Sequence, residues 1–382
     1  MKVALVHDYF NQNGGAEKVC ETILSIYPDA DIFTSVFNPL NFTESTNIIG
    51  SYKSGKVRTS FLNSIFIKNS KPTYWIKYFK HLYFVYPFAM YMMQVKNYDL
   101  VLISSTYSAK NIRLKNNKKI IHYCHSPARF LHGLVTEKDH STLPIWQRVI
   151  SFLISPILKM IDLGAVRNLV NHNTIWVSNS KFIQDTINNV YHVDSQIIYP
   201  PVEINKFAQV VRNPEPKEEF YLCHGRISFH KRLDLAIQAC LMLNRKLIIS
   251  GTSALENDMT NLKKLIPEGK QDLIKFLGRT TDDELSELVS NAKAMLFPGK
   301  EDAGIAPIEM IAAGLPVIAY QSGGALEYVI DKVNGVFFKD QDVESLVAKI
   351  MEFESIQFQT STIKSTVAKF SDKYFIEQIK NL

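Results

Sequence analysis

Two glutamates, Glu301 and Glu309, stand eight positions apart in the stretch EDAGIAPIE. Pro307 fits the first turn of a helix, where its missing N–H costs nothing, and this places Glu309 in the same turn. Free backbone N–H groups and the helix dipole favour an anionic ligand at such a loop-to-helix junction. Carboxylates also accept hydrogen bonds from vicinal hydroxyls, as on a ribose or a hexose. Alone, however, Glu309 is explained by its favourable charge near a helix N-terminus.

A second candidate anion site lies in CHGRISFHKRLDLAIQA, residues 223–239. Arg226 and Lys231 precede a helix that is predicted to begin near Leu233. The helix dipole disfavours two cations at this end, and an anion bound between them would relieve that cost. A diphosphate fits this description. The alternative is a solvated loop whose cations are simply exposed.

Two further stretches follow predicted strands in the first half of the chain. Gly14 and Gly15 begin a helix, so the backbone there could approach an anion closely. An ordinary tight turn also explains this pair, and its spacing differs from G-x-G-x-x-G. His125, in HYCHSPARF, follows a strand at the end where α/β sheets bind ligands. A structural, hydrogen-bonding histidine is the alternative.

Short apolar runs alternate with helical patterns through the chain, which predicts parallel sheets with helices on both faces. In the first half, a helix is predicted over 16–27 and strands over 2–7, 31–37, 100–105, 120–124 and 175–178. In the second half, a helix is predicted over 233–243 and strands over 220–223, 246–250, 275–277, 294–297, 317–320 and 336–338.

The 382 residues indicate two domains rather than one core. Residues 196–207, stiffened by Pro200-Pro201, and the polar residues 212–219 are predicted to link them. The predicted fold is α/β, with two Rossmann-like domains that face a cleft, where ligands bind at the carboxyl ends of the strands. The domains are expected at residues 1–200 and 201–369.

Charge and composition narrow the class of protein further. The net charge is +6, yet residues 51–130 hold 14 lysines and arginines against one acid, Asp99, with aromatic residues interleaved. This mixture suits an anionic membrane surface, and also nucleic acid or a solvated basic face. The most apolar window, Leu82–Val95, is too short to span a membrane. Four well-separated cysteines indicate reduced thiols, not a disulfide frame or zinc site. The start MKVALVHDY lacks a signal-peptide pattern, which predicts a cytoplasmic protein.

Together these stretches resemble retaining glycosyltransferases of the two-Rossmann-domain type (GT-B, family 4), and among them bacterial O-antigen mannosyltransferases. The most specific part is E-x7-E, followed by AAGLPVIAY and by GG-x-x-E in QSGGALEYV. GR-x4-K, GGAEKV, HSPARF and VRTSFL complete the set. The resemblance covers essentially the whole chain. It also implies that a last helix, within residues 370–382, crosses back to the first domain.

The resemblance implies a role for each motif. Arg226 and Lys231 would hold the nucleotide diphosphate, and Glu309 the ribose hydroxyls. Gly14 and Gly15 would let the first domain approach the phosphates, and His125 would contact the sugar near the reacting carbon. The donor sugar would be held by Glu301 and by the backbone N–H groups of Asp302, Ala303, Gly304 and Ile305. Family members often have a bulky residue where this chain has Ala303, so the sugar pocket is expected to be wider.

The implied activity is a metal-independent, retaining transfer of a hexose, with GDP-mannose as the expected donor and no cofactor. The acceptor would be a lipid-linked oligosaccharide or glycan in O-antigen, lipopolysaccharide or capsule synthesis. The protein would be peripheral at the inner face of the cell membrane, contacting anionic lipid through residues 51–130 and binding no nucleic acid. A sugar-nucleotide epimerase or a phosphorylase could share the fold. A non-catalytic membrane-surface adaptor is a further alternative, and a nucleotide-dependent oxidoreductase is weaker because the glycine spacing differs.

Overall fold

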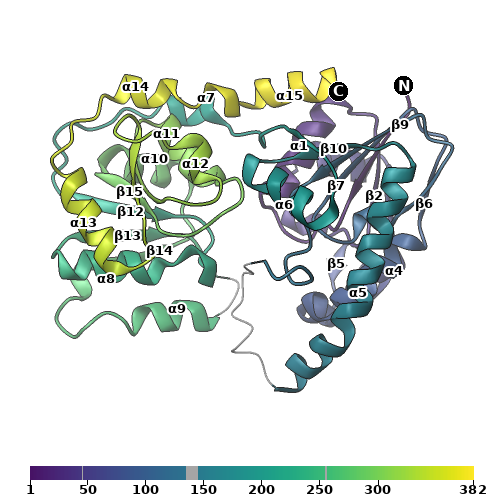
Figure 1. Ribbon diagram of the computed structural model, residues 1–382, viewed down its shortest axis with the longest axis horizontal. Helices are drawn as coiled ribbons and strands as arrows, with labels where there is room; N and C mark the ends of the chain where they lie inside the picture. Colours follow the sequence, from purple (N-terminus) through teal and green to yellow (C-terminus); the bar gives the residue numbers. More distant parts are fainter. Residues whose placement is uncertain (45, 135–144, 254–255) are drawn as a thin grey trace. The chain divides into compact units, whose positions relative to one another are not determined.

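The computed structural model describes residues 1–44, 46–134, 145–253 and 256–382 (Figure 1). The chain forms two compact units. The first holds the described residues up to Pro201 together with Ile376–Leu382, and the second holds Val202–Phe375. Each unit is built around one parallel sheet, so the predicted α/β class is confirmed.

The sheet of the first unit has the order β11-β10-β9-β7-β1-β2-β3. Its strands are parallel throughout: β1 (Val3–His7), β2 (Asp31–Thr34), β3 (Val57–Thr59), β7 (Leu100–Ser105), β9 (Lys119–Cys124), β10 (Ile175–Ser178) and β11 (Gln196–Ile197). The associated helices are α1 (Gly15–Ile26), α2 (Asn47–Lys53), α3 (Leu62–Phe66), the 3-10 helix η2 (Tyr74–Val85), α4 (Tyr86–Tyr91), α5 (Ile145–Asn171) and α6 (Lys181–Tyr191). Two short strand pairs, β4 (Ile67–Lys68) with β5 (Lys71–Pro72) and β6 (Gln94–Lys96) with β8 (Arg113–Lys115), lie outside this sheet.

The sheet of the second unit has the order β14-β13-β12-β15-β16-β17. Its strands are β12 (Phe220–His224), β13 (Lys246–Ser250), β14 (Ile274–Gly278), β15 (Ala294–Phe297), β16 (Val317–Tyr320) and β17 (Gly335–Phe338). Its helices are α7 (Ile204–Ala208), α8 (Leu233–Met242), α9 (Glu256–Lys263), α10 (Asp282–Asn291), α11 (Ile305–Ala312), α12 (Ala325–Tyr328), α13 (Val343–Phe353) and α14 (Thr360–Ser365), and α15 (Asp372–Asn381) follows them. The predicted strands are present, although the strand predicted over 31–37 ends at Thr34.

Side-chain alternation explains why helices cover both faces of the second sheet. Tyr221 and Cys223 of β12 point to one face, where they share a core with α8 and α13. The residues between them point to the other face, where α10 contacts β12 and α11 contacts β15 and β16. Figure 1 shows these two layers of helices on either side of the sheet. Because both faces are covered, the strands are continuous apolar runs rather than alternating ones.

The order of strands reverses once in each unit. In the first, β1 leads through β2 to β3, and the chain then returns to place β7 on the other side of β1. In the second, β12 leads through β13 to β14, and β15 then returns to the other side of β12. Loops diverge at such a switch point, which makes it the usual ligand site of an open α/β sheet. The switch points therefore lie between β1 and β7 and between β12 and β15.

The predicted linker is shorter than expected. Gln196–Ile197 pairs with β10 as the edge strand of the first sheet, and α7 packs on α11 in the second unit. The two units meet in sequence at Pro201 and Val202, directly after the Pro200-Pro201 pair. The C-terminal helix returns as expected, since Ile376–Leu382 belongs to the first unit. There the Nζ of Lys119 donates to the carbonyl oxygen of Leu382 at 2.5 Å.

A fully buried charge network holds α5 to the first unit. The Nζ of Lys110 lies 2.7 Å from Oδ1 of Asp162 on α5, and neither side chain is exposed. Oδ2 of Asp162 accepts hydrogen bonds from His132 at 2.9 Å and from the hydroxyl of Tyr191 at 2.8 Å. Lys110 therefore belongs to the core and not to the predicted basic surface. Some aromatic residues predicted for that surface, Phe79 among them, are likewise buried.

Candidate functional site

Three loops follow the neighbouring strands β12, β15 and β16 in the second unit, on both sides of its switch point. The first loop carries Arg226 and Lys231, and the second carries Glu301–Gly304. The third holds the Gly323-Gly324 pair. Parallel strands end at the same edge of a sheet, so stretches far apart in sequence meet here. The predicted donor site of the second unit is thus assembled from consecutive strand ends.

Lys231 and Glu301 form an ion pair between Nζ and Oε1 across the switch point. Their side chains are 14% and 17% exposed, so the pair is largely shielded yet open to solvent at one side. Lys231 ends a 3-10 turn, Phe229–Lys231, and the following Arg232 has the left-handed φ of 51°. This turn holds Lys231 beside β15, with its Nζ 5.7 Å from the centre of the Phe297 ring. The GR-x4-K and E-x7-E motifs are therefore in direct contact through this ion pair.

Close backbone packing fixes the loop that carries Glu301. Gly304 caps α11 with φ +67°, and a Cβ on it would lie 2.2 Å from the hydroxyl of Tyr328. Gly324 approaches the same loop so closely that a Cβ would lie 2.3 Å from the carbonyl oxygen of Asp302. The N–H of Gly324 donates to the carbonyl oxygen of Glu301 at 2.8 Å. The GG-x-x-E motif therefore supports the E-x7-E motif physically.

The remaining residues of the predicted donor site lie on the same elements. Arg226 is exposed in the loop after β12. Asp302 and Ala303 are half-buried, and Ile305 is the first residue of α11. Glu309 is buried, but α11 begins at Ile305, so Glu309 lies in the second helical turn and not in the first as predicted. The physical reason is that left-handed Gly304 starts the helix two residues before Pro307.

A series of hydrogen bonds and one ion pair in the first unit connects the Gly14-Gly15 helix start to His125. The Gly14 N–H donates to Oε2 of Glu17 at 2.9 Å, and Oε1 of Glu17 lies 3.7 Å from Nε2 of His7. Nδ1 of His7 donates to the carbonyl oxygen of Ser104 at 3.0 Å. The Ser104 hydroxyl lies 2.8 Å from Nε2 of His125. Residues from β1, α1, β7 and the end of β9 thus meet at the switch point.

His7 and His125, which belong to this series of contacts, differ in charge: the pKa of one is raised and that of the other is lowered. Burial, together with the charge of the neighbouring His7, lowers the pKa of His125 to about 4, so the ring is neutral near pH 7. Burial also disfavours a charged His7, but Cys20 and Glu17 outweigh this and raise its pKa well above the ordinary value. His7 is therefore the cation that neutralises Glu17. A neutral His125 at a strand end fits the predicted contact with a neutral sugar.

Sequence reasoning missed two residues of the first unit. Glu17 is the acid of GGAEKV, and it is buried against His7. Asp8 follows β1 directly and accepts from the backbone N–H groups of Thr106, Tyr107 and Ala109 at 2.6–3.1 Å, and from the hydroxyl of Ser108. It joins the loops on both sides of the switch point. The sequence signal that could have identified Asp8 is its place in HDY, directly after a buried strand.

We expect Glu17→Gln to flatten the pH dependence of stability near neutrality. The raised pKa of His7 means that its stabilising charge is fully present below about pH 6.5 and is lost as the pH rises through the raised value. Without the Glu17 carboxylate, the part of this contribution that comes from the ion pair is lost at every pH in that range. Thermal unfolding of the full chain between about pH 6 and 9 measures it.

Glu21→Gln is the matched control for Glu17→Gln. Glu21 lies on the same helix and accepts from the backbone N–H groups of Asn47 and Ile48, which do not titrate. It should destabilise the chain by about 1 kcal/mol without changing the pH profile near neutrality. Identical pH profiles for wild type and Glu17→Gln would show that the pair does not set the charge of His7.

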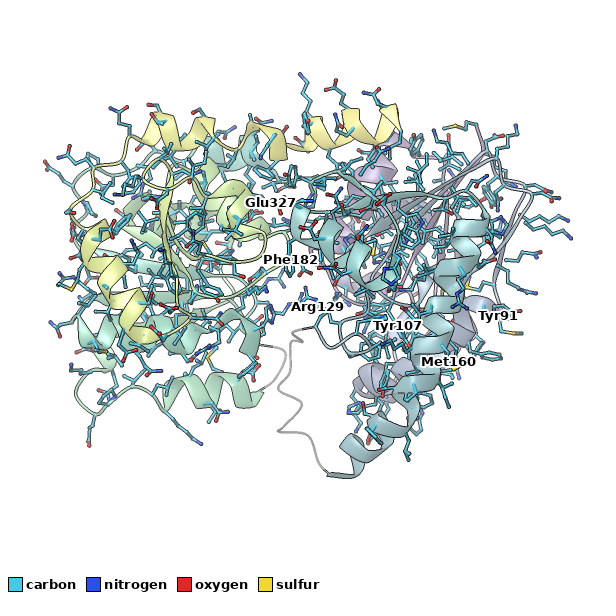
Figure 2. The ribbon with its side chains drawn as sticks, viewed as in Figure 1. Tyr91, Tyr107, Arg129, Met160, Phe182 and Glu327 are labelled. Carbon is cyan, nitrogen blue, oxygen red and sulfur yellow. The ribbon has the colours of Figure 1, made fainter. Side chains whose placement is uncertain are left out.

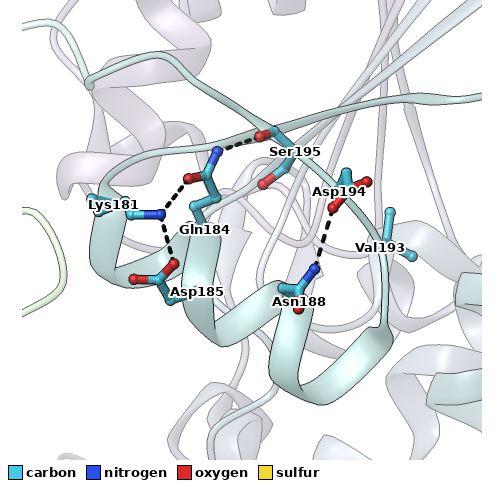
Figure 3. Close-up of a pocket in the computed structure, with 7 residues that line it drawn as sticks. All are labelled: Lys181, Gln184, Asp185, Asn188, Val193, Asp194 and Ser195. Atoms are coloured by element: carbon cyan, nitrogen blue, oxygen red, sulfur yellow. Dashed lines mark hydrogen bonds and ion pairs between the residues drawn. The ribbon is translucent and has the colours of Figure 1, made fainter.

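The pocket drawn in Figure 3 lies beside α6 and contains none of the predicted site residues. It is lined by Lys181, Gln184, Asp185, Asn188, Val193, Asp194 and Ser195. Lys181 donates to Gln184 at 3.0 Å and pairs with Asp185 at 2.8 Å, while Asn188 donates to Asp194 at 3.2 Å. These polar groups bind one another, so we do not assign the pocket to the reaction. Within the described residues, no cluster of three or more His, Cys, Asp or Glu could hold a metal, and no helix is long and apolar enough to cross a membrane.

Known structures share the fold of the whole chain. HepE of Anabaena, solved in complex with UDP, superposes with a TM-score of 0.66 at 17% identity, covering 100% of this chain and 99% of that one. Sucrose-phosphate synthase from Thermosynechococcus elongatus gives a TM-score of 0.66 at 15% identity, covering 100% and 98%. At these identities the likeness concerns the fold alone. It agrees with the two parallel-sheet units described above.

Residues 205–369 match the family described as glycosyl transferases group 1, and this range contains Arg226, Lys231, Glu301 and Glu309. This match, together with the shared fold, supports a glycosyltransferase of the GT-B type. The chain resembles mannosyltransferases: human alpha-1,3/1,6-mannosyltransferase ALG2 is 26% identical over 301 residues, which cover 69% of this chain and 67% of that protein. The resemblance to GT-B glycosyltransferases and to mannosyltransferases is confirmed. The roles of the individual residues, the donor and the acceptor stay predictions.

Proposed function

We propose that this glycosyltransferase transfers a hexose, mannose from GDP-mannose, to a lipid-linked or glycan acceptor in the synthesis of a cell-surface polysaccharide such as O-antigen, lipopolysaccharide or capsule. The observation that carries the proposal is the Lys231–Glu301 ion pair at the switch point of the second unit. It joins a cation suited to a diphosphate with a carboxylate suited to sugar hydroxyls. The mannose donor is supported by the O-antigen motifs and by the likeness to a mannosyltransferase.

The charges that develop in the reaction indicate which residues would stabilise them. Cleavage of the bond between the anomeric carbon and the phosphate oxygen leaves negative charge on the diphosphate and positive charge on the carbon. Arg226 and Lys231 would stabilise the leaving diphosphate as its charge grows. We propose a transfer that needs no metal ion and no cofactor. The anomeric configuration would be retained by attack from the face that the diphosphate leaves, with a phosphate oxygen accepting the acceptor proton.

The ion pair also defines what happens when the donor binds. Lys231 is neutralised by Glu301 in the unliganded chain. A diphosphate that binds Lys231 competes with this carboxylate for the ammonium group, and the carboxylate can then accept hydrogen bonds from the donor sugar. In this proposal Lys231 binds the diphosphate in place of Glu301, and Glu301 binds the sugar of the same donor in place of Lys231. Glu301 is a positioning group for the sugar in this proposal, and Gly15 and His125 of the first unit approach the phosphates and the sugar.

The first test is thermal unfolding of the full chain with GDP, UDP, dTDP and ADP, followed by their sugar conjugates. A ligand that binds the native state raises the melting temperature, so selective stabilisation by GDP supports the proposed donor. Stabilisation by UDP alone would replace GDP-mannose with a uridine donor. Turnover is then followed as release of the nucleoside diphosphate with a lipid-linked oligosaccharide acceptor.

We expect Glu309→Ala to abolish most of this nucleotide-induced stabilisation. Its buried carboxylate is proposed to accept hydrogen bonds from the ribose, and losing them should weaken binding by about 10- to 100-fold. The comparison is nucleotide titration of wild type and variant, with Glu344→Ala, an exposed acid on α13, as the control. Equal nucleotide affinity in Glu309→Ala would exclude the ribose contact.

The same assays separate the other activities that the fold allows. The family match does not favour an epimerase or a phosphorylase. An epimerase would isomerise the sugar nucleotide without an acceptor, and a phosphorylase would require inorganic phosphate. A non-catalytic adaptor would show no turnover, and its binding to a membrane or partner would not change in Glu301→Ala.

A further inference from the structure

Helix α5 (Ile145–Asn171) is apolar on two opposite faces. Its inner face is buried and includes Leu158, Asp162 and Leu169, held by the charge network with Lys110. The opposite side is strongly exposed instead. We define the outer face of α5 by Phe152, Leu153, Ile157, Met160 and Ile161, which are 79%, 64%, 59%, 74% and 42% exposed.

An ordinary surface helix turns polar side chains outward and needs one apolar stripe for the core. The outer face of α5 is a second stripe, spaced for one side of a helix over residues 153, 157, 160 and 161. Scattered exposed apolar residues are normal, but a contiguous group of this kind marks a surface that contacts something else. Lengthwise the outer face runs from residue 152 to residue 161, across the middle of α5.

Helix α5 adjoins η2, and η2 and α4 carry further exposed apolar side chains. Tyr83 of η2 and Ile154 of α5 pack against one small core of Ala128, Leu131 and Leu158, so these elements adjoin. Figure 2 shows Met160 on α5 and Tyr91 on α4 of the same unit. The exposed large side chains of η2 and α4 are Tyr74, Trp75, Tyr78, Phe84, Phe88 and Tyr91.

Among the described side chains of α5, η2 and α4, the exposed charges are of one sign. On α5, Lys159 and Arg167 are exposed, whereas Asp162, the one acid in its sequence, is buried against Lys110. On η2, the Nζ of Lys77 lies 3.6 Å from the centre of the Tyr74 ring. The sequence holds no acid from residue 46 to residue 98. An apolar face bordered by cations and by Trp and Tyr matches the interface of an anionic bilayer.

We propose that the outer face of α5 inserts into the headgroup region of an anionic lipid bilayer, with η2 and α4 beside it. This extends the expected membrane contact beyond residues 51–130 and names the element that enters the lipid. The inference deepens the proposed function, because a lipid-linked acceptor would be presented at that surface. Lipid binding does not itself require transfer, so each can fail without the other.

The first experiment is co-sedimentation of the full chain with vesicles of phosphatidylcholine, with and without phosphatidylglycerol. We expect binding that requires phosphatidylglycerol and weakens with salt. The combined variant Phe152→Gln, Ile157→Gln, Met160→Gln should bind at least about tenfold more weakly, because apolar area no longer enters the lipid. These positions are exposed and glutamine favours helix, so the variant should fold.

A matched control carries the same chemical change elsewhere. Leu40, Met242 and Met351 are 65%, 64% and 59% exposed and lie outside the outer face of α5. Replacing all three with glutamine should leave vesicle binding unchanged. Nucleotide-induced stabilisation is measured on both triple variants, so that a failure of lipid binding is distinguished from a failure of the donor site.

A site-specific probe tests insertion directly. The four native cysteines are buried and free, so an environment-sensitive fluorophore attaches selectively to Met160→Cys. We expect its emission to shift to the blue with phosphatidylglycerol vesicles, while the same probe at Leu40→Cys does not shift. Equal binding of the α5 variant and wild type, or no shift at position 160, would overturn the proposal. A shift that depends on protein concentration without vesicles would assign the face to a second copy of the chain and also overturn it.

Discussion

Lys231→Ala is expected to lower kcat/KM by about 100- to 1000-fold, the usual effect of removing one preorganised donor to a developing anion. Lys231 lies at the switch point of the second sheet and is 14% exposed, so its charge acts where water screens it weakly. A leaving diphosphate carries more charge than the ground-state donor. The loss should therefore fall mainly on the transition state, measured as initial rates of GDP release over a range of donor concentrations.

The ion pair supplies an internal control for Lys231→Ala. Removing the lysine also leaves Glu301 without its cation, which could repel the donor phosphates. Combining Lys231→Ala with Glu301→Gln removes that repulsion, and activity should remain low if the lysine stabilises the leaving group. Lys293→Ala is the matched control, because Lys293 pairs with Glu219 at 3.0 Å and precedes β15, at the opposite edge of the sheet. Near-normal activity of Lys231→Ala would exclude the leaving-group role.

Asp162→Ala is expected to destabilise the first unit by about 3–5 kcal/mol, more than any surface substitution. The change leaves the ammonium group of Lys110 fully buried without its counter-ion, and it removes the hydrogen-bond acceptor of His132 and Tyr191. Thermal unfolding of the full chain detects the loss. Hydrogen exchange in α5 assigns it to the first unit, and peptides from the second sheet serve as the reference.

Removing both charges should cost much less than removing one. Lys110→Met with Asp162→Asn leaves no buried ion and retains polar contacts for Tyr191, so we expect most of the stability to return. Burial alone would raise the pKa of Asp162, but Lys110 and the hydrogen bonds outweigh this and lower it. Its contribution is thus complete above about pH 4 and is lost as the pH falls through the lowered pKa. A cost below about 1 kcal/mol for Asp162→Ala would refute this account.

The strands were predictable because both faces of each sheet are covered. A strand buried on both faces must be a continuous apolar run, as in Val3–His7 and Ala294–Phe297, and such runs stand out from the sequence. The linker was predicted less well. Gln196–Ile197 and Ile204–Ala208 are short elements whose sheet and helix partners are distant in sequence, so local pattern does not reveal them.

The candidate site was predicted as a set of motifs but not as a set of contacts. Glycines and charges at strand ends identified Arg226, Lys231, Glu301 and Glu309, because an open parallel sheet binds its ligands at the loops that follow its strands. The prediction that Glu309 lies in the first turn of its helix was wrong, because the left-handed Gly304, and not Pro307, marks the start of α11. Glu17 and Asp8 were missed because their hydrogen-bond partners lie on other strands.

The sequence by itself determined the α/β class, the two repeated sheets and the family resemblance, because these depend on local periodicity and on motif order. The tertiary structure decided which motif residues touch, as with Lys231 and Glu301, 70 positions apart, since strand order sets which loops adjoin. It also decided that Lys110 is core while the outer face of α5 is exposed. The charge and apolarity of a side chain follow from its residue type, but its burial depends on which neighbours the fold places around it.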